Sequence, residues 1–353
     1  MKTHKLSEGT EFSVPSLRGV FYENGRFCRV PDEVVRKITG KCRDLVENSV
    51  YSHARETAGG RVYFATNSKF IRLTAHYPYY KNLGVQMGAG KTGFDVFADG
   101  VLIKTLEAEA PDFAKGLEYR AVADTPWSYS WEIELLGAMT DVVVYLPILS
   151  ELSEIEVVLD GEVQKCTSEP TGAPIVFYGS SITQGGMTSS ASKSYVSTLA
   201  RSLNKDYINL GMWGSCHGEK AMAEYIASLS MSAFVLDYDH NDAAVHPFKE
   251  RHFEVYETVR RAHESVPILM ISRPNNQLGK EATLEMKRAI VENYECAKRS
   301  GDENVYFLDG ESIMNYSEST DFYSESDKVH PLSAGHAKMA EVIGKALKDI
   351  ICS

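Results

Sequence analysis

The stretch Pro174–Gly186, PIVFYGSSITQGG, is the segment around which the rest of the chain can be ordered. It begins with an apolar run rich in β-branched and aromatic residues, which is typical of a short buried strand. The run breaks at Gly179, and Ser180 and Ser181 follow, ahead of a helix-like segment near residues 194–200. In an open α/β sheet, ligands bind just beyond the carboxyl ends of the strands. The sequence therefore places a serine hydroxyl at the rim of a crevice, where a nucleophile is expected.

From residue 172 onward, apolar segments alternate with longer amphipathic ones. Strands are predicted at Pro174–Phe177, Tyr207–Leu210, Ala233–Leu236, Pro267–Ile271 and Val305–Leu308. Helices are predicted over residues 217–229, 250–264, 281–299 and 334–350. This alternation of strand and helix predicts an α/β fold, in which a parallel sheet has helices on both faces.

The residues ahead of about position 165 carry many short strand signals and little helical period. The pair Asp99-Gly100 between two apolar runs predicts a β-hairpin. Further strands are expected at residues 61–66 and 70–76, on either side of a turn, and at 130–136, 142–146 and 154–159. Such a series predicts a β-sandwich. Trp127, Tyr129 and Trp131 alternate along one strand and share a face, which suits either the sandwich core or a platform for stacking sugars.

Length and composition limit the possible functions. At 353 residues two domains are expected, and the linker-like stretch 167–172 divides the chain into residues 1–170 and 171–353. A formal charge of −11 disfavours nucleic acid and anionic membranes as partners, and no apolar stretch reaches membrane-spanning length. The six scattered cysteines contain no CxxC pair, which is typical of reduced thiols. The first residues show no signal-peptide pattern, so a cytoplasmic protein is expected.

Four polar clusters follow the predicted strands. They lie at Gly179–Ser181, Asn209–Gly214, Asp237–Asp242 and Asp327–Pro331. Because the carboxyl ends of parallel strands meet at one edge of a sheet, these clusters are expected to line one crevice. Together they offer a hydroxyl, a glycine amide, an asparagine side chain and an Asp/His pair. Acyl transfer requires that inventory: a nucleophile, a base, an acid that orients the base, and oxyanion donors.

In order and content, these clusters resemble the sequence blocks of the SGNH hydrolases, the superfamily that includes the GDSL lipases and esterases. The resemblance covers about half of the chain, from Pro174 to the end. It implies roles for five residues: Ser181 as nucleophile, with its amide in the oxyanion hole; Gly214 and Asn241 as further oxyanion donors; and Asp327 and His330 as the DxxH pair that completes a triad.

Two positions depart from the family pattern. The usual Asp before the nucleophile is Ser180 here, which puts the local orientation of the loop in question, and Asp239-His240 precede Asn241 where many members carry Gly and Thr. The motif YGSSITQG resembles that of one SGNH subgroup with an N-terminal β-sandwich. The segment Gly93–Phe97, GFDVF, is likewise similar to the GxDLY motif of that sandwich.

The implied roles have physical reasons. A serine hydroxyl is a poor nucleophile at neutral pH and needs a base within hydrogen-bond reach. His330 can take the proton and return it to the leaving group, while Asp327 fixes the imidazole tautomer. His336 is a rival base, but it falls within the last predicted helix.

Other polar residues near the strand ends have simpler interpretations. A cluster after the third strand of the predicted sheet lacks the ligand spacing of a metal site and is expected to be a solvated loop: Asp237, Asp239, His240, Asp242 and His246. Arg273 suits a substrate contact or a surface salt bridge. Trp213 is a candidate wall of the substrate pocket. No metal or organic cofactor is expected.

These inferences predict a serine esterase. Its C-terminal domain is expected to be a three-layer α/β/α fold with a flavodoxin-like sheet, preceded by a β-sandwich of jelly-roll-like type. By resemblance, it hydrolyses short-chain acyl esters, acetyl above all, on a carbohydrate or similar small molecule through an acyl-enzyme on Ser181. Two alternatives are an acyltransferase with the same triad and an inactive carbohydrate-binding protein. The intact Ser181, Asp327 and His330 disfavour the second.

Overall fold

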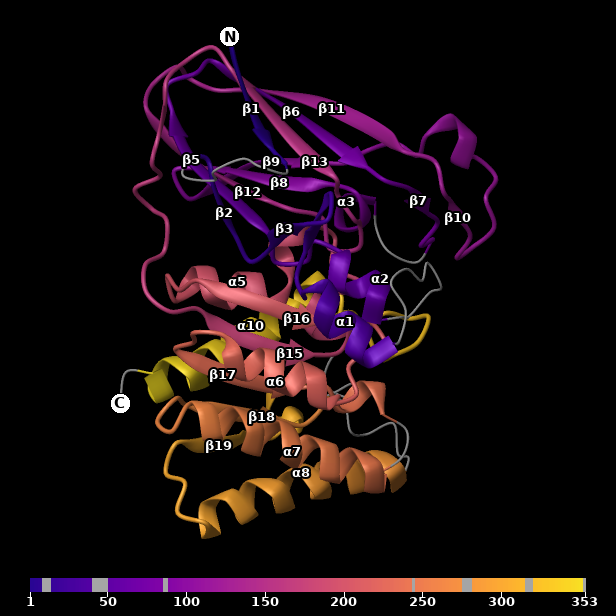
Figure 1. The fold of residues 1–353 in the computed structure, drawn as a ribbon, viewed down its shortest axis with the longest axis vertical. Coiled ribbons are helices and arrows are strands. Elements are labelled where there is room, and N and C mark those ends of the chain that lie inside the picture. Colours follow the sequence, from indigo (N-terminus) through magenta and orange to yellow (C-terminus); the bar gives the residue numbers. More distant parts are fainter. Residues whose placement is uncertain are drawn as a thin grey trace.

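The computed structural model describes residues 1–7, 14–39, 50–84, 88–242, 245–274, 281–314 and 320–351. Antiparallel sheets form one end of the molecule, and a parallel sheet with its helices forms the other (Figure 1). The cysteines within the described ranges are free thiols, as predicted, whereas Cys42 and Cys352 lie outside them. None of the helices in these ranges is both long and apolar enough to cross a bilayer.

Two antiparallel sheets pack face to face in the N-terminal part. The first has the strand order β1-β13-β6-β11, with bounds Lys2–Leu6, Glu154–Leu159, Phe70–Tyr77 and Trp127–Glu134. The second has the order β14-β5-β12-β8-β9, with bounds Val163–Gln164, Arg61–Thr66, Thr140–Tyr145, Phe94–Ala98 and Val101–Leu106; β2 (Ser16–Arg18) also pairs with β5. Buried apolar side chains from both sheets form one core between them. The predicted β-sandwich is confirmed.

Both predicted turns of the sandwich are present, but they connect their strands in different ways. The hairpin predicted at Asp99-Gly100 is present as the antiparallel pair β8 and β9. Strands β5 and β6, by contrast, belong to opposite sheets, because the chain crosses between the sheets at a corner where Asp160 accepts hydrogen bonds from Ser68 and the Lys69 amide. The shorter elements are β3 (Phe21–Glu23), β4 (Arg26–Cys28), β7 (Tyr80–Lys81), β10 (Val122–Ala123), α1 (Asp32–Thr39), α2 (Val50–Arg55), α3 (Gly88–Lys91) and η1 (Asp112–Ala114).

The two tryptophans of the aromatic stripe along β11 belong to the edge of the sandwich core. Trp127 stacks on Tyr77 with ring centroids 4.1 Å apart, and Trp131 meets the buried Phe94 edge to face at 5.4 Å. Both indoles pack against the core cluster. Of the two interpretations of this stripe, the geometry favours core packing over a sugar platform.

The parallel sheet has the strand order β16-β15-β17-β18-β19, with bounds Tyr207–Gly211, Ile175–Gly179, Ala233–Asp237, Ile268–Ile271 and Val305–Leu308. In order of sequence this is 2-1-3-4-5, the flavodoxin-like arrangement. Every residue of β15 is buried because helices cover both faces of the sheet. All the strands predicted for this half of the chain are present, and the order of the sheet places its switch point between β15 and β17.

Helices cover the two faces of the sheet in separate groups. Helices α5 (Tyr195–Ser202) and α10 (Ser333–Ile351) pack on one face, and α6 (Lys220–Ser228), α7 (Val245–Ala262) and α8 (Glu281–Arg299) pack on the other (Figure 1). The four predicted helices correspond to α6, α7, α8 and α10, although α7 begins earlier than expected. The short helices are α4 (Ser181–Gln184), α9 (Gly310–Ile313), η2 (Ala191–Lys193), η3 (Asp239–Asn241) and η5 (Thr320–Phe322).

The N-terminal part is joined to the parallel sheet by buried polar contacts. The Arg29 guanidinium is fully buried and donates to the carbonyl oxygens of Asn209, at 2.8 Å, and Gly211, at 2.7 Å, on β16. Arg61 on β5 forms an ion pair with Asp206, just before β16, at 2.5 Å. Side chains of α1 and α2 share an apolar core with the sheet. The boundary near residue 170 stays a prediction.

Candidate active site

Ser181 lies where the sequence predicts it, at the carboxyl end of β15 and the start of α4. Gly179 is required at the end of this strand, because a Cβ there would collide with the Asp237 carbonyl oxygen and the Thr183 hydroxyl. Ser180 caps the helix: its Oγ accepts a hydrogen bond from the Ile182 amide at 3.2 Å. Serine and aspartate are both good residues for this capping role. The replacement of the family's Asp by Ser180 therefore keeps the helix start in place.

His330 and Asp327 form a chain of hydrogen bonds with Ser181. Ser181 Oγ lies 2.7 Å from His330 Nε2, and His330 Nδ1 lies 2.6 Å from Asp327 Oδ2. The other carboxylate oxygen, Oδ1, accepts the backbone amides of Val329 and His330 at 2.9 and 3.0 Å. Partial burial opposes ionisation of Asp327, but hydrogen bonds from His330 and these amides lower its pKa to about 2. The geometry matches a nucleophile, a base and an ionised group that orients the base.

His336, the rival base, is fully buried in α10 and held by backbone groups on both sides. Its Nδ1 accepts the Tyr195 amide at 3.1 Å, and its Nε2 donates to the Gly186 carbonyl oxygen at 3.1 Å. Burial lowers the pKa of His336 to about 4. Because both ring nitrogens form hydrogen bonds with the backbone, this imidazole stabilises the loop after α4 and is not available as the base for Ser181.

The expected oxyanion donors follow the ends of three adjacent strands. The Ser181 amide opens α4, where N–H groups have no partner within the helix. Gly214 adopts a left-handed conformation, with φ of 63°, in the loop after β16. Asn241, after β17, donates from Nδ2 to the Met212 carbonyl oxygen at 3.1 Å. This hydrogen bond connects the loop after β17 to the loop after β16. Trp213, between Met212 and Gly214, stacks its ring on His330 with centroids 4.8 Å apart.

The polar cluster at the end of β17 is only in part the solvated loop that the sequence predicts: the His246 side chain is exposed, but two of the carboxylates are buried. Asp237 and Asp239 are 2% and 1% exposed. Asp237 accepts the Tyr195 hydroxyl at 2.9 Å, and Asp239 forms an ion pair with Arg273 at 3.1 Å. Asp242 pairs with Arg251 at 2.8 Å. The prediction is wrong for Asp237 and Asp239. Buried carboxylates require hydrogen bonds, and here other strands and helices supply partners that the local sequence does not indicate.

The Asp237 carboxyl gives rise to a prediction about stability. Burial, reinforced by the neighbouring Asp239 carboxylate, raises the pKa of Asp237 from 3.8 to about 7. At pH values between these two pKa values, the folded state binds more protons than the unfolded state. The free energy of unfolding therefore falls as pH rises from about 4 to 7, by at most about 4 kcal/mol. Asparagine can still accept from the Tyr195 and Thr183 hydroxyls. We therefore expect Asp237→Asn to flatten the pH dependence of the melting temperature, measured by calorimetry at pH 5 and pH 8.

A matched control for this prediction is Asp141→Asn, since hydrogen bonds from Thr167 and Ser168 lower rather than raise the pKa of that partly exposed carboxyl. It should leave the decline between pH 5 and pH 8 unchanged. An Asp237→Asn protein that loses stability over this range as steeply as the wild type would contradict the assignment.

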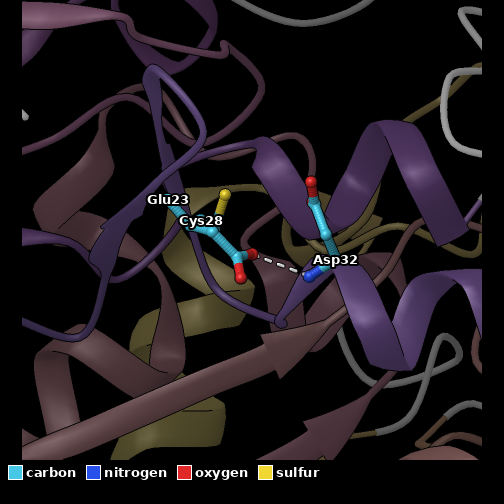
Figure 2. Close-up of side chains that lie close together, drawn as sticks. All are labelled: Glu23, Cys28 and Asp32. Carbon is cyan, nitrogen blue, oxygen red and sulfur yellow. Dashed lines mark hydrogen bonds between the residues drawn. The ribbon is translucent and has the colours of Figure 1, made fainter.

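Among the described residues of the N-terminal part, two clusters could supply metal ligands, and protein groups already contact most of their donor atoms. In the first, Glu23 Oε2 accepts a hydrogen bond from the Asp32 backbone amide at 2.7 Å, beside Cys28 (Figure 2). The Asp32 carboxylate binds Asn24 and Arg55. Burial raises the pKa of the Cys28 thiol to about 12, so its sulfur stays protonated rather than becoming a metal-binding thiolate. These contacts cap α1 and fix its orientation.

In the second cluster, Glu154 and Glu156 lie near His76 on the outer face of the sandwich, and Lys5 bridges both carboxylates at 3.1 and 2.5 Å. A lysine ammonium in this position takes the place that a cation would occupy. Neither cluster has the donor chemistry of a built metal site.

Sequence reasoning missed one part of the site. Gln184, the last residue of α4, is 1% exposed and hydrogen-bonded to Glu56, between α2 and β5 in the N-terminal part. Gln184 was visible only as a polar residue of the loop after the nucleophile. Glu56 carried no signal, because nothing in its local sequence indicates that it reaches a residue so far along the chain.

The flavodoxin-like sheet carries a serine, an asparagine and an Asp/His pair around its switch point. This combination is typical of the SGNH class of α/β hydrolases. The model of the GDSL-like lipase/acylhydrolase family matches residues 172–348, and the chain belongs to this family. It is a carboxylic ester hydrolase with an additional N-terminal β-sandwich. A sequence search of curated proteins gave no match.

Several solved structures share both parts of the fold. A protein of Bacteroides ovatus ATCC 8483, described as a GDSL-like lipase, is 24% identical, with a TM-score of 0.76 over 99% of this chain and 98% of its own. The salicylyl-acyltransferase SsfX3 of a tetracycline biosynthetic pathway is 20% identical, with a TM-score of 0.75 over 99% and 97%. A family two carbohydrate esterase of Clostridium thermocellum is 18% identical, with a TM-score of 0.60 over 83% and 92%. At these identities the likeness concerns the fold.

Proposed function

We propose that the protein is a serine esterase that removes short acyl groups, acetyl above all, from a carbohydrate or similar small molecule. The observation that carries the proposal is the continuous hydrogen-bond chain from Ser181 through His330 to Asp327. Such a chain activates a hydroxyl for attack on an ester carbonyl. Its members come from two segments that lie far apart in the sequence, and each hydrogen bond has the length that proton transfer requires.

In the proposed reaction, Ser181 Oγ attacks the ester carbonyl carbon as His330 Nε2 takes the hydroxyl proton. The tetrahedral intermediate collapses, the carbon–oxygen bond to the alcohol breaks, and His330 returns the proton to the departing alkoxide. Water then attacks the acyl-enzyme with His330 again as base, which releases the carboxylic acid and restores Ser181. Asp327 stays ionised throughout and stabilises the imidazolium that forms.

The developing oxyanion would be bound by the amides of Ser181 and Gly214 and by the Asn241 side chain. An amide NH₂ group carries two protons, so Asn241 can bind the oxyanion with one while the other bonds to Met212. Each such donor is typically worth about 3 kcal/mol of transition-state stabilisation. The hydrogen bond between Asn241 and Met212 orients two of the proposed donors relative to each other before substrate arrives.

The substrate class is inferred from the surroundings of Ser181. The loops after β15, β16 and β17 are rich in small and polar residues, and Trp213 is the large apolar side chain beside the triad. Such walls can enclose an acetyl group and contact hydroxylated alcohols, but they offer little surface to a long acyl chain. Similar folds in carbohydrate esterases support a sugar as the alcohol. The similar fold of an acyltransferase supports the alternative in which a second alcohol, in place of water, receives the acyl group.

We expect kcat/KM for aryl esters to be highest with acetyl or propionyl and to fall as the chain lengthens. A longer chain gains about 0.8 kcal/mol per methylene only where apolar surface buries it. The test is a series from acetyl to palmitoyl, run after dialysis against EDTA and compared with acetylated sugars. Values of kcat/KM that rise through octanoyl would contradict the assigned pocket. Activity that is lost on dialysis against EDTA and restored by Zn²⁺ would contradict a metal-free mechanism. Acetyl transfer to added sugar in place of release as acetate would identify a transferase.

A further inference from the structure

The Gln184 side chain connects the N-terminal part to the loop that carries the proposed oxyanion donor. We propose that Glu56 is a positioning residue for the reaction: it fixes the orientation of the Gln184 amide, and Gln184 in turn holds Trp213 and Gly214 in place. This inference rests on the proposed function, and it assigns to the β-sandwich a role in the geometry of catalysis.

The side-chain atoms of Gln184 are held on both sides. Nε2 donates to Glu56 Oε2 at 2.5 Å and to the Ile148 carbonyl oxygen at 3.3 Å, and Oε1 accepts the Trp213 amide at 2.8 Å. The backbone at Gln184 is also closely packed, because a Cβ on Gly211, at the end of β16, would collide with the backbone nitrogen of Gln184. Gln184 therefore fixes the path of the chain immediately after β16.

Glu56 is an ionised acceptor in a buried site. Its Oε2 also bonds to His53 Nδ1 at 2.6 Å, and Lys81 Nζ lies 3.9 Å from Oε1. Burial opposes the charge, but His53, Lys81 and Arg29 together lower the pKa of Glu56 to about 2. These neighbours thus keep a carboxylate where only 1% of the residue is exposed.

A carboxylate can only accept hydrogen bonds, and this property selects one orientation of the neighbouring amide. With Nε2 toward Glu56, the carbonyl oxygen of Gln184 faces the Trp213 amide, and both polar atoms of the Gln184 side chain are paired. The flipped amide would set an oxygen against the carboxylate and an NH₂ against the Trp213 N–H. Glu56 therefore determines that the group facing the Trp213 amide is an acceptor.

The loop held by Gln184 contacts two parts of the proposed machinery. The Trp213 ring stacks on His330, and Gly214, the next residue, is the proposed oxyanion donor. A shift of the Trp213 backbone would displace both together. Misplacement of catalytic groups by about 1 Å can cost 100-fold in rate, although neither Glu56 nor Gln184 touches the reacting atoms.

Gln184→Glu is the sharpest test, because it changes one nitrogen to oxygen and sets two carboxylates against each other. We expect kcat to fall 10- to 100-fold with an acetyl ester, counted per site titrated with an organophosphonate, while KM changes less than threefold. The double variant Glu56→Gln with Gln184→Glu restores a donor–acceptor pair in the opposite sense, and it should regain most of the lost kcat. Gln184→Met, of similar volume, removes all three side-chain hydrogen bonds and should lower kcat without any change of charge.

The matched control is Asp206→Asn, which weakens the ion pair with Arg61, another buried link between the two parts, at the opposite end of β16. It should lower the melting temperature and leave kcat per titrated site unchanged. The proposal is wrong if Gln184→Glu and Gln184→Met keep the wild-type kcat per titrated site, or if the double variant gains nothing over Gln184→Glu. Failure of the proposed function is a separate result, since the wild type would then hydrolyse none of the esters.

Discussion

Ser181→Ala is expected to lower kcat for an acetyl ester at least 1000-fold, with little change in the melting temperature. The proposed acyl-enzyme forms on Ser181 Oγ, which lies 2.7 Å from His330 Nε2, and alanine removes the only atom that can form that bond. The residual rate would come from substrate binding and the oxyanion donors alone. Steady-state rates with an aryl acetate give the loss, and thermal unfolding shows whether the fold is kept.

Ser180→Ala is the matched control, because this adjacent hydroxyl caps α4 and has no bond to His330 in the proposed mechanism. Loss of an N-cap costs about 1 kcal/mol of stability, so most of the activity should remain. An organophosphonate should attach to Ser181. Label found on Ser180, or full activity in Ser181→Ala, would overturn the assignment of the nucleophile.

Asp327→Asn should reduce kcat by about 1000- to 10,000-fold. The carboxylate accepts the Nδ1 proton of His330 and so leaves Nε2 free to act as the base. An asparagine that presents its NH₂ group to Nδ1 would favour the other tautomer, in which Nε2 carries the proton and cannot accept the one from Ser181. The measurement is kcat for the variant and the wild type across a pH series.

The pH series adds a second criterion. Because the pKa of Asp327 is lowered to about 2, its charge is present above about pH 4 and is lost only as pH falls through 2. Asp327 therefore stays ionised between pH 5 and pH 9, and the variant should keep a large loss of kcat across this whole range. Glu325→Gln, an exposed neighbour in the same loop, should match the wild type throughout. A ratio that falls toward one within this range would contradict the role assigned to Asp327.

The role proposed for Glu56 bears on why the hydrolase domain carries a β-sandwich. Buried contacts between the two parts cluster along β16, where Arg29 and Arg61 of the N-terminal part bind its ends. The loop that follows β16 holds Trp213 and Gly214. In this arrangement the sandwich supports the edge of the sheet from which a proposed oxyanion donor projects, a position that an open sheet leaves without a neighbouring strand.

Local patterns in the sequence were sufficient for the elements of the fold. Apolar runs gave the parallel strands, and the Asp99-Gly100 pair gave a hairpin, because both depend on neighbouring residues. The bond between Asp327 and His330 is also local, since the two residues are three positions apart in one turn. The motif around Ser181 predicted its place at a strand end, because the transition from strand to helix is encoded in Gly179 and the capping Ser180.

Tertiary structure alone decided the contacts between distant segments. Ser181 and His330 are 149 residues apart, and Glu56 and Gln184 are 128 apart, so only packing of the sheets and helices brings these pairs within hydrogen-bond distance. The burial of Asp237 and Asp239 was missed for the same reason. A carboxylate is solvated or buried according to the partners that other elements supply, and one stretch of sequence does not specify those partners.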